Sequence, residues 1–92
     1  MVNPLNERFG ARLRSLRGDR GYSQEQMAEL AGLDRSFYGR VERGTQNVAL
    51  TTLARVAAGL EMSLSEMLAG IQVTPAELAK LPKRGSGNGR KQ

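Results

Sequence analysis

Residues 23–43 read SQEQMAELAGLDRSFYGRVER, and this stretch decides the fold. Ser23, followed three residues later by Gln26, forms a capping box and predicts that a helix begins here. Gly32 permits a tight turn, after which Asp34 caps a second helix. Two short helices joined by a turn of about three residues predict a helix-turn-helix.

Apolar residues give each of these helices one side that faces a core. In the first helix we expect the inward residues to be Met27, Leu30 and Ala31, with the small Ala28 where the two helices cross. In the second helix, which ends at Gly44, the larger apolar residues are Phe37, Tyr38 and Val41. The Tyr38 hydroxyl must therefore reach the surface or find a hydrogen-bond partner inside.

Helical spacing continues on both sides of this stretch. Before it, Asn3 and Pro4 predict the start of a helix whose apolar stripe is Leu5, Phe9, Leu13 and Leu16. After it, a fourth helix runs from Leu50 to about Gly59, although Ala49 offers it no capping side chain.

Two further helix starts follow. Ser63 and Glu66 form a second capping box, opening a fifth helix that passes through Leu64, Met67, Leu68 and Ile71. Thr74, Pro75 and Glu77 repeat the signal for a short last helix, which we expect to bury Leu78 and Leu81 and to end at Pro82.

The chain is predicted to be all-α, with five helices and a short additional C-terminal helix in one domain over residues 1–81. Its 92 residues suffice for one core. Residues 82–92 contain glycine, serine, asparagine and basic residues with nothing apolar to bury, which predicts a flexible, disordered basic tail.

Composition excludes several classes of function. The chain has no cysteine and no histidine, so we expect no disulfide, no metal site and no cofactor. It also lacks a Walker-type phosphate loop, and its carboxylates are scattered among arginines, which argues against an enzyme. No apolar run is long enough to span a membrane, and the N-terminal residues lack the character of a signal peptide.

The net charge of +5 must be judged by its location. Four of the positive charges, on Lys83, Arg84, Arg90 and Lys91, lie in the tail, so residues 1–81 carry a net charge of only +1. Any argument for nucleic-acid binding therefore depends on a local cluster of basic residues.

Several short stretches of the sequence resemble those of a known family. They are Leu13-Arg14-Ser15-Leu16-Arg17, Gly21-Tyr22-Ser23-Gln24, Leu33-Asp34-Arg35-Ser36, Val41-Glu42-Arg43-Gly44, and the later Leu53, Ala54, Ala57, Leu60 and Ser63-Leu64-Ser65-Glu66. With them, the segment 9–68 resembles the Cro and phage-repressor family of bacterial helix-turn-helix regulators, the xenobiotic-response-element class. Within that class it is most similar to the controller proteins of restriction-modification systems.

The resemblance implies a lambda-repressor-like domain and a sequence-specific transcriptional regulator, either a repressor or a controller that regulates its own gene. Its partner would be double-stranded DNA with a pseudo-palindromic operator, in the bacterial cytoplasm and on the nucleoid when bound. The operator sequence, the target genes and the direction of regulation do not follow from one chain.

The helix 34–43 is expected to read the major groove. Arg35, Ser36, Gly39, Arg40 and Arg43 lie away from its apolar residues and share an outer face. An arginine can bind the O6 and N7 atoms of guanine through two hydrogen bonds, and early residues of a recognition helix lie deepest in the groove. We therefore expect Arg35, Ser36 and Arg40 to contact bases. For Arg40 and Arg43, contact with phosphate alone remains an equal alternative.

Contacts to the DNA backbone are expected around this helix. The free N–H groups at the helix start favour a phosphate near Ser23 and Gln24, although the capping role of Ser23 needs no DNA. On the helix itself, Phe37, Gly39 and Arg43 are further candidates for backbone contact. The resemblance adds Thr45, Gln46 and Asn47 in the loop that follows, which can equally be ordinary turn residues. Gly39, in mid-helix, suggests a close approach of the helix backbone to DNA.

The resemblance also implies an ion pair between Arg17 and Glu42, which would join the first and third helices. Late in the chain, a homodimer interface of the fourth and fifth helices is predicted at Leu60, Met62, Leu64, Met67, Leu68 and Ile71, and Val73 extends this apolar cluster. The alternative is that the short last helix covers these residues.

A second class of function stays open at this point. An antitoxin-type module, which binds a toxin or another regulatory protein and also its own promoter, would use the basic tail to fold on its partner.

Overall fold

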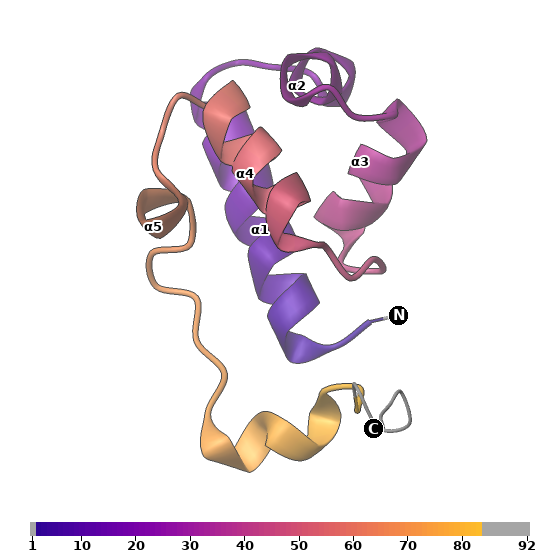
Figure 1. The fold of residues 1–92 in the computed structure, drawn as a ribbon, viewed down its shortest axis with the longest axis vertical. Helices are drawn as coiled ribbons and strands as arrows, with labels where there is room; N and C mark the ends of the chain where they lie inside the picture. The colour runs from indigo at the N-terminus through magenta and orange to yellow at the C-terminus, as the bar shows by residue number, and fades with distance from the viewer. Residues whose placement is uncertain (1, 84–92) are drawn as a thin grey trace.

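The computed structural model describes residues 2–83, and these residues form helices without any β-strand. In chain order the helices are α1 (Pro4–Asp19), α2 (Gln24–Ala31), α3 (Arg35–Arg43), α4 (Leu50–Gly59), α5 (Leu64–Met67) and the 3-10 helix η1 (Pro75–Lys80) (Figure 1). The all-α prediction is confirmed. Most of the predicted tail, residues 84–92, lies outside the described residues.

Local capping starts most of these helices where the sequence predicts. The Asn3 side chain accepts a hydrogen bond from the Asn6 amide at 2.9 Å, and Pro4 is the first residue of α1. The capping boxes of Ser23 and Ser63 both form. Each cap satisfies a backbone N–H group that has no partner within the helix.

The core lies among the α-helices, because α1 packs on α3, α3 on α2, α2 on α4 and α4 on α5. Figure 1 shows α2 and α3 at one end of the molecule and η1 at the opposite end. The buried apolar side chains come from all five α-helices and are Phe9, Leu13, Leu16, Met27, Ala28, Ala31, Tyr38, Val41, Val56, Ala57, Leu60 and Met67.

Two glycines let helix backbones approach closely. A Cβ atom added to Gly10 on α1 would lie 2.3 Å from the carbonyl oxygen of Glu42 on α3. A Cβ atom on Gly59 of α4 would lie 3.2 Å from the carbonyl carbon of Leu30 on α2. The position of α3 is thus set by backbone contact with α1.

Two residues predicted to lie on an inward apolar side are exposed. Leu5 is 40% exposed and Leu30 is 50% exposed, so these assignments were wrong. Leu50, with which the predicted fourth helix begins, is 69% exposed. In α2, the side that packs on the core is occupied by Met27, Ala28 and Ala31, and Leu30 lies at the edge of that side. Leu50 is the first residue of α4, where the helix has not yet reached the core.

The last two helices are shorter than predicted. α5 ends at Met67, before Leu68 and Ile71, and a turn at Gly70 with φ of +82° follows. The predicted last helix is the 3-10 helix η1, which buries no residue, and its Leu78 is 67% exposed. The expectation that Leu78 forms a buried edge was therefore wrong, and Leu81 is only half-buried.

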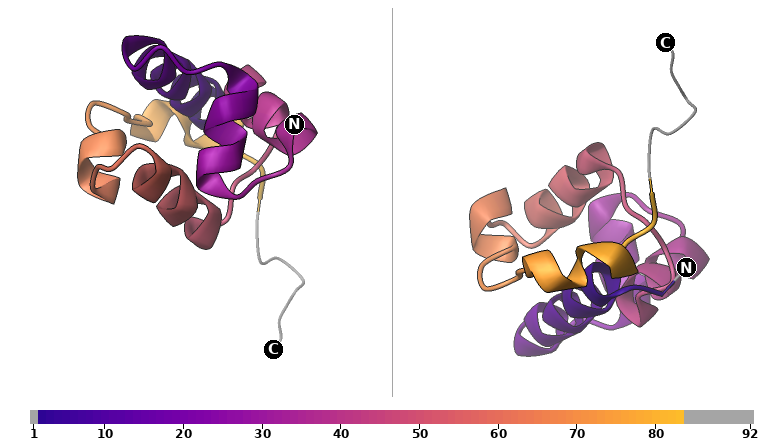
Figure 2. Two further views of the ribbon diagram at one scale, coloured as in Figure 1. Left: turned by 90° about the horizontal axis from the view of Figure 1, so that it is seen from above. Right: turned by 90° about the horizontal axis from the view of Figure 1, so that it is seen from below.

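Polar contacts tie η1 to α1 instead. The Arg8 guanidinium pairs with the Glu77 carboxylate and donates a hydrogen bond to the carbonyl of Gln72 at 2.7 Å. The hydrogen bonds from Arg8, followed by that from the Thr74 amide, lower the pKa of Glu77 to about 2. Figure 2 shows η1 crossing the end of the molecule where α1 begins.

Glu61, in the turn between α4 and α5, has φ of +58°. We expect Glu61→Gly to raise the free energy of unfolding by about 0.5–1 kcal/mol. The left-handed conformation costs a residue with a Cβ atom about 1–2 kcal/mol, and glycine avoids this cost. Part of the gain is offset because glycine has more conformational entropy in the unfolded chain. Gly70→Ala is the converse control, at φ of +82° with open space for a Cβ atom. Urea unfolding measures both, and a loss of stability in Glu61→Gly would contradict the prediction.

Candidate nucleic-acid interface

The helix-turn-helix forms as the sequence predicts. Gly32 has φ of +70° and ends α2, and the Asp34 side chain accepts a hydrogen bond from the Phe37 amide at 3.1 Å to start α3. Gly44, with φ of +77°, ends α3. Because these turns are fixed by local hydrogen bonds and glycine conformations, α3 follows α2 in one defined arrangement.

The outer face of α3 carries most of the predicted residues. Arg35, Ser36, Arg40 and Arg43 are exposed, while Phe37 is half-buried. Gly39 is buried, so its assignment to the outer face was wrong. A Cβ atom on Gly39 would lie 3.3 Å from a guanidinium nitrogen of Arg43 and 3.8 Å from the Gln24 side-chain oxygen, which are the groups that cover it.

Arg35 and Ser36, at the start of α3, have no side-chain partner within residues 2–83. The Arg35 guanidinium therefore keeps all five N–H donors available to an external acceptor. Its place in the first turn of α3 matches the position from which a recognition helix contacts base edges.

Arg40 is held along the same face. Its guanidinium carbon lies 5.8 Å from the centre of the Phe37 ring, and its Nε donates a hydrogen bond to the Gln46 side chain at 3.3 Å. A cation over an aromatic face is attracted to the ring. Phe37 thus contributes an apolar contact to the core and also positions Arg40.

The loop after α3 is closed by its own hydrogen bonds. The Thr45 hydroxyl donates to the Arg40 carbonyl at 3.2 Å, and the Gln46 amide donates to the Asn47 carbonyl at 3.3 Å. Asn47 accepts a hydrogen bond from the Asn6 side chain at 2.7 Å, which fastens the loop to α1. The predicted loop residues Thr45, Gln46 and Asn47 therefore lie together beside α3.

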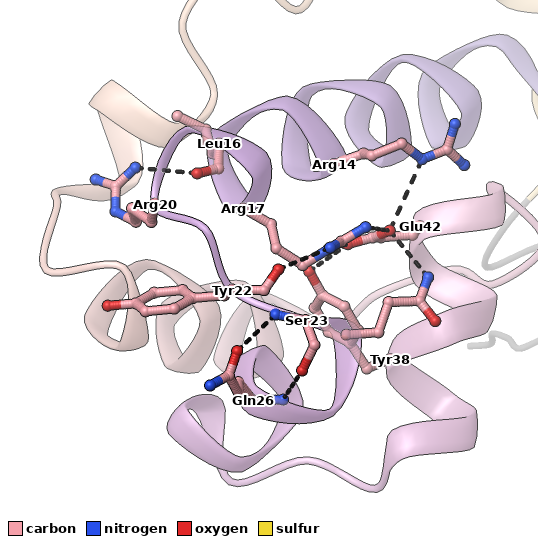
Figure 3. Close-up of polar contacts among 10 residues, drawn as sticks. Arg14, Leu16, Arg17, Arg20, Tyr22, Ser23, Gln26, Tyr38 and Glu42 are labelled. Carbon is pink, nitrogen blue, oxygen red and sulfur yellow. Dashed lines mark hydrogen bonds and ion pairs between the residues drawn. The ribbon is translucent and has the colours of Figure 1, made fainter.

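The carboxylate of Glu42 is the centre of a cluster that joins three helices, and Figure 3 shows it between α1 and α3. Its side chain is fully buried. Arg17 donates from Nε to Oε2 at 2.5 Å and from its terminal nitrogen to Oε1 at 3.1 Å. The Tyr38 hydroxyl donates to Oε2 at 2.6 Å. We name Arg14, Arg17, Gln24, Tyr38 and Glu42 the Glu42 cluster.

The cluster confirms the Arg17–Glu42 ion pair and answers the question about Tyr38, whose hydroxyl finds its partner inside. Burial by itself raises the pKa of Glu42, but hydrogen bonds from Arg17, Tyr38 and Gln24 outweigh burial, so the pKa lies below its ordinary value. Burial and the hydrogen bond to Glu42 raise the pKa of Tyr38. The carboxylate is thus charged and the phenol neutral over the physiological range.

Gln24, expected beside a phosphate, also has a partner inside the protein. Its side-chain nitrogen donates to Glu42 Oε1 at 3.0 Å. The contact spans 18 positions of sequence and two helices, which local patterns do not reveal. The amide oxygen remains directed over Gly39.

The proposed dimer residues divide into two groups. Leu60 and Met67 are 2% and 0% exposed and belong to the core of the same chain, so assigning them to a surface was wrong. Met62, Leu64, Leu68 and Ile71 are half-buried and pack at the margin of that core. Beside the last two, an open apolar pocket of about 240 Å³ is also lined by Leu5, Asn6, Phe9, Val48 and Leu53.

Arg14 of the Glu42 cluster was not predicted from the sequence to be a functional residue. Arg14 Nε lies 3.8 Å from Glu42 Oε1, and its side chain is 61% exposed. The spacing of three residues between Arg14 and Arg17 places both on the side of α1 that faces α3, and this signal was present in the sequence.

Other sites are absent from the part of the chain that the structure describes. Within residues 2–83, no three acidic, histidine or cysteine side chains gather closely enough to hold a metal ion. None of the helices in this range has the length and apolar character needed to cross a membrane.

Comparisons with known proteins agree with this geometry. A family model described as a helix-turn-helix domain matches residues 8–81. The chain is 39% identical to control protein C.MunI of Mycoplasma over 72 residues, covering 77% of this chain and 97% of that protein. It is 41% identical to control protein C.SmaI of Serratia marcescens over 64 residues, covering 70% and 76% of the two chains.

Solved structures give the same result. The restriction-modification controller protein C.AhdI from Aeromonas hydrophila is similar with a TM-score of 0.66 and 47% identity, covering 67% of this chain and 94% of that one. The clp gene regulator ClgR from C. glutamicum has a TM-score of 0.65 and 34% identity, covering 70% and 83%.

Proposed function

Because the chain belongs to the helix-turn-helix domain family, we propose that this DNA-binding transcriptional regulator reads the major groove of a pseudo-palindromic operator with α3. The observation that carries the proposal is the exposed Arg35 guanidinium, which has no partner within residues 2–83, in the first turn of a helix whose other side is held to α1 by the Glu42 cluster. A rigid helix and a free cationic donor are what direct base reading requires.

Base contacts are assigned to Arg35, Ser36 and Arg40. Arg35 and Ser36 are exposed and unpaired within the described residues, and Arg40 is directed by Phe37 and Gln46. Backbone contacts are assigned to the surrounding groups, which are Ser23, Gln24, Phe37, Gly39, Arg43, Thr45, Gln46 and Asn47. For Gly39 the contribution is indirect, since the side chains of Gln24 and Arg43 cover it.

The regulator is proposed to act as a homodimer. The exposed Leu50 and the half-buried Met62, Leu64, Leu68 and Ile71 supply apolar surface on α4, α5 and the segment after it. A two-fold dimer would place two copies of α3 about 34 Å apart, in successive major grooves of one DNA face. Residues 1–81 would be the DNA-binding domain and residues 82–92 a flexible basic tail.

The biological role is proposed from the relatives. Control proteins C.MunI and C.SmaI match most of their own length, which favours a controller of a restriction-modification system that acts on its own promoter. Its place would be the bacterial cytoplasm, on the nucleoid when bound. The chain is a regulator and not an enzyme, and the antitoxin-type alternative is not favoured by relatives that are named as regulators.

Arg35→Ala tests the proposal on DNA from upstream of the protein's own coding sequence. We expect the wild type to protect two symmetric half-sites in a footprint. The substitution should reduce the difference in binding free energy between this DNA and random DNA by about 1–3 kcal/mol, because one bidentate base contact is lost. Affinity for both duplexes is measured by fluorescence anisotropy over a series of salt concentrations.

Arg35→Lys is the matched control, because lysine keeps the charge but lacks the planar fork of donors. If Arg35 reads a base, lysine should leave the specificity low. Recovery of full specificity in Arg35→Lys, or a wild type that prefers no duplex over random DNA, would overturn the assignment.

A further inference from the structure

Arg14 is distinguished from the other arginines of α1 and its C-cap by its unused donors. Arg8 binds Glu77 and the Gln72 carbonyl, and Arg12 donates to the carbonyls of Glu66 and Met67 at 2.8 and 3.1 Å. Arg17 and Arg20 likewise donate to groups of the same chain. Arg14 makes no hydrogen bond within residues 2–83 and is paired only with Glu42, at 3.8 Å.

The Glu42 carboxylate has little remaining capacity to accept a hydrogen bond from Arg14. Its two oxygens already accept hydrogen bonds from Arg17, Tyr38 and Gln24. At 3.8 Å the carboxylate attracts the Arg14 guanidinium and orients it without taking up its N–H groups. The 61% exposed side chain of Arg14 therefore presents its donors to solvent at the edge of the cluster.

Gln24 connects Arg14 to the edge of α3. Its nitrogen donates to Glu42 Oε1, the oxygen nearest Arg14, at 3.0 Å. Its own oxygen and the Arg43 guanidinium both lie over Gly39. Contacts through Glu42 and Gly39 thus connect Arg14, Gln24 and Arg43 along one patch built from α1, α2 and α3.

The charge of this patch is positive. Arg17 neutralises Glu42, and within residues 2–83 neither Arg14 nor Arg43 has a further carboxylate partner. A phosphate diester matches such a patch, because a guanidinium can hold two of its oxygens through two parallel hydrogen bonds.

We propose that Arg14 binds a phosphate of the DNA backbone, forming with Gln24 and Arg43 a single phosphate site that spans three helices. The site rests on the proposed function, since it adds a contact beside the recognition helix. Arg14 fixes the position of the protein on the duplex and reads no base, as contacts to phosphate do. Glu42 acts through Arg14 and Gln24 as a positioning residue.

Arg14→Gln tests the site, with Lys80→Gln as the control that removes one charge from the exposed surface of η1. Affinities are measured by anisotropy across a salt series, on the protein's upstream DNA and on a random duplex of equal length. We expect Arg14→Gln to weaken binding to both duplexes about five- to tenfold and to reduce the slope of log K against log salt by about 0.9.

The control should leave the slope unchanged, and the melting temperature of Arg14→Gln should stay close to that of the wild type. Equal slopes for Arg14→Gln and Lys80→Gln would overturn the phosphate contact even if the wild type selects its upstream DNA. A wild type without sequence preference would instead overturn the proposed function, while a reduced slope in Arg14→Gln would still support the phosphate site.

Discussion

Glu42→Ala is expected to lower the free energy of unfolding by about 3–5 kcal/mol, since removing one partner of a buried ion pair strands the other charge. The Arg17 guanidinium would lose both of its bonds to the carboxylate, and the Tyr38 hydroxyl, which is fully buried, would lose its acceptor. A domain of this size has a total stability of about 5–15 kcal/mol, so this loss would remove a large share of it. Urea unfolding at fixed protein concentration measures it.

A double-mutant cycle separates the ion pair from simple loss of volume. In Glu42→Ala combined with Arg17→Ala, no charge is left stranded, so the loss should be clearly smaller than the sum of the two single losses. Glu66→Ala, at an exposed capping position, controls for removal of a carboxylate from the surface. Additive losses in the cycle would show that Glu42 and Arg17 are not coupled.

The same carboxylate makes the stability depend on acid. Because the pKa of Glu42 in the folded protein lies below its ordinary value of 4.5, the stabilisation from its ionised form is complete above that pH. It declines as the pH falls below 4.5 toward the folded-state pKa. In Glu42→Ala this part of the decline should be missing.

Local features were predictable from the sequence. The caps at Ser23, Asp34 and Ser63 each involve a side chain and an amide three residues away, so the spacing alone identifies them. The left-handed turns at Gly32 and Gly44 follow from the same kind of local signal.

Features that depend on distant contacts were not predictable in this way. The hydrogen bond from Gln24 to Glu42 and the exposure of Leu30 both depend on how α2 packs against the neighbouring helices. The periodicity of the sequence predicts only which residues share a face of a helix. The segment after α5 is held by Arg8 and Glu77, 69 positions apart, and apolar spacing at Leu78 gave a misleading signal there.

The role of Gly10 beside the candidate site could not be predicted from the sequence. A glycine in the middle of a helix usually weakens it, and nothing in the neighbouring sequence indicates why this one is present. The structure gives the reason, because Gly10 lies against the backbone of α3 at Val41 and Glu42. The orientation of α3 therefore depends on a residue that has no side chain.

Gly10→Ala is expected to lower the free energy of unfolding by about 2–3 kcal/mol, although alanine is the better helix former, because overpacking a tight contact is destabilising. The added Cβ atom would lie 2.3 Å from the carbonyl oxygen of Glu42 and 2.9 Å from that of Val41. Both atoms are backbone, so α1 and α3 must separate. The same shift would disturb the Glu42 cluster and turn Arg35, so we expect DNA affinity to fall further than stability alone explains.

Gly18→Ala on the same helix is the matched control, since a Cβ atom there meets nothing within 4 Å. It should raise stability by about 0.5–1 kcal/mol through helix propensity. The two substitutions introduce the same methyl group into α1 with opposite expected signs, measured by urea unfolding and by anisotropy with the upstream DNA. If Gly10→Ala were stabilising, the space between α1 and α3 would accommodate a methyl group. The close backbone contact would then not determine the orientation of α3.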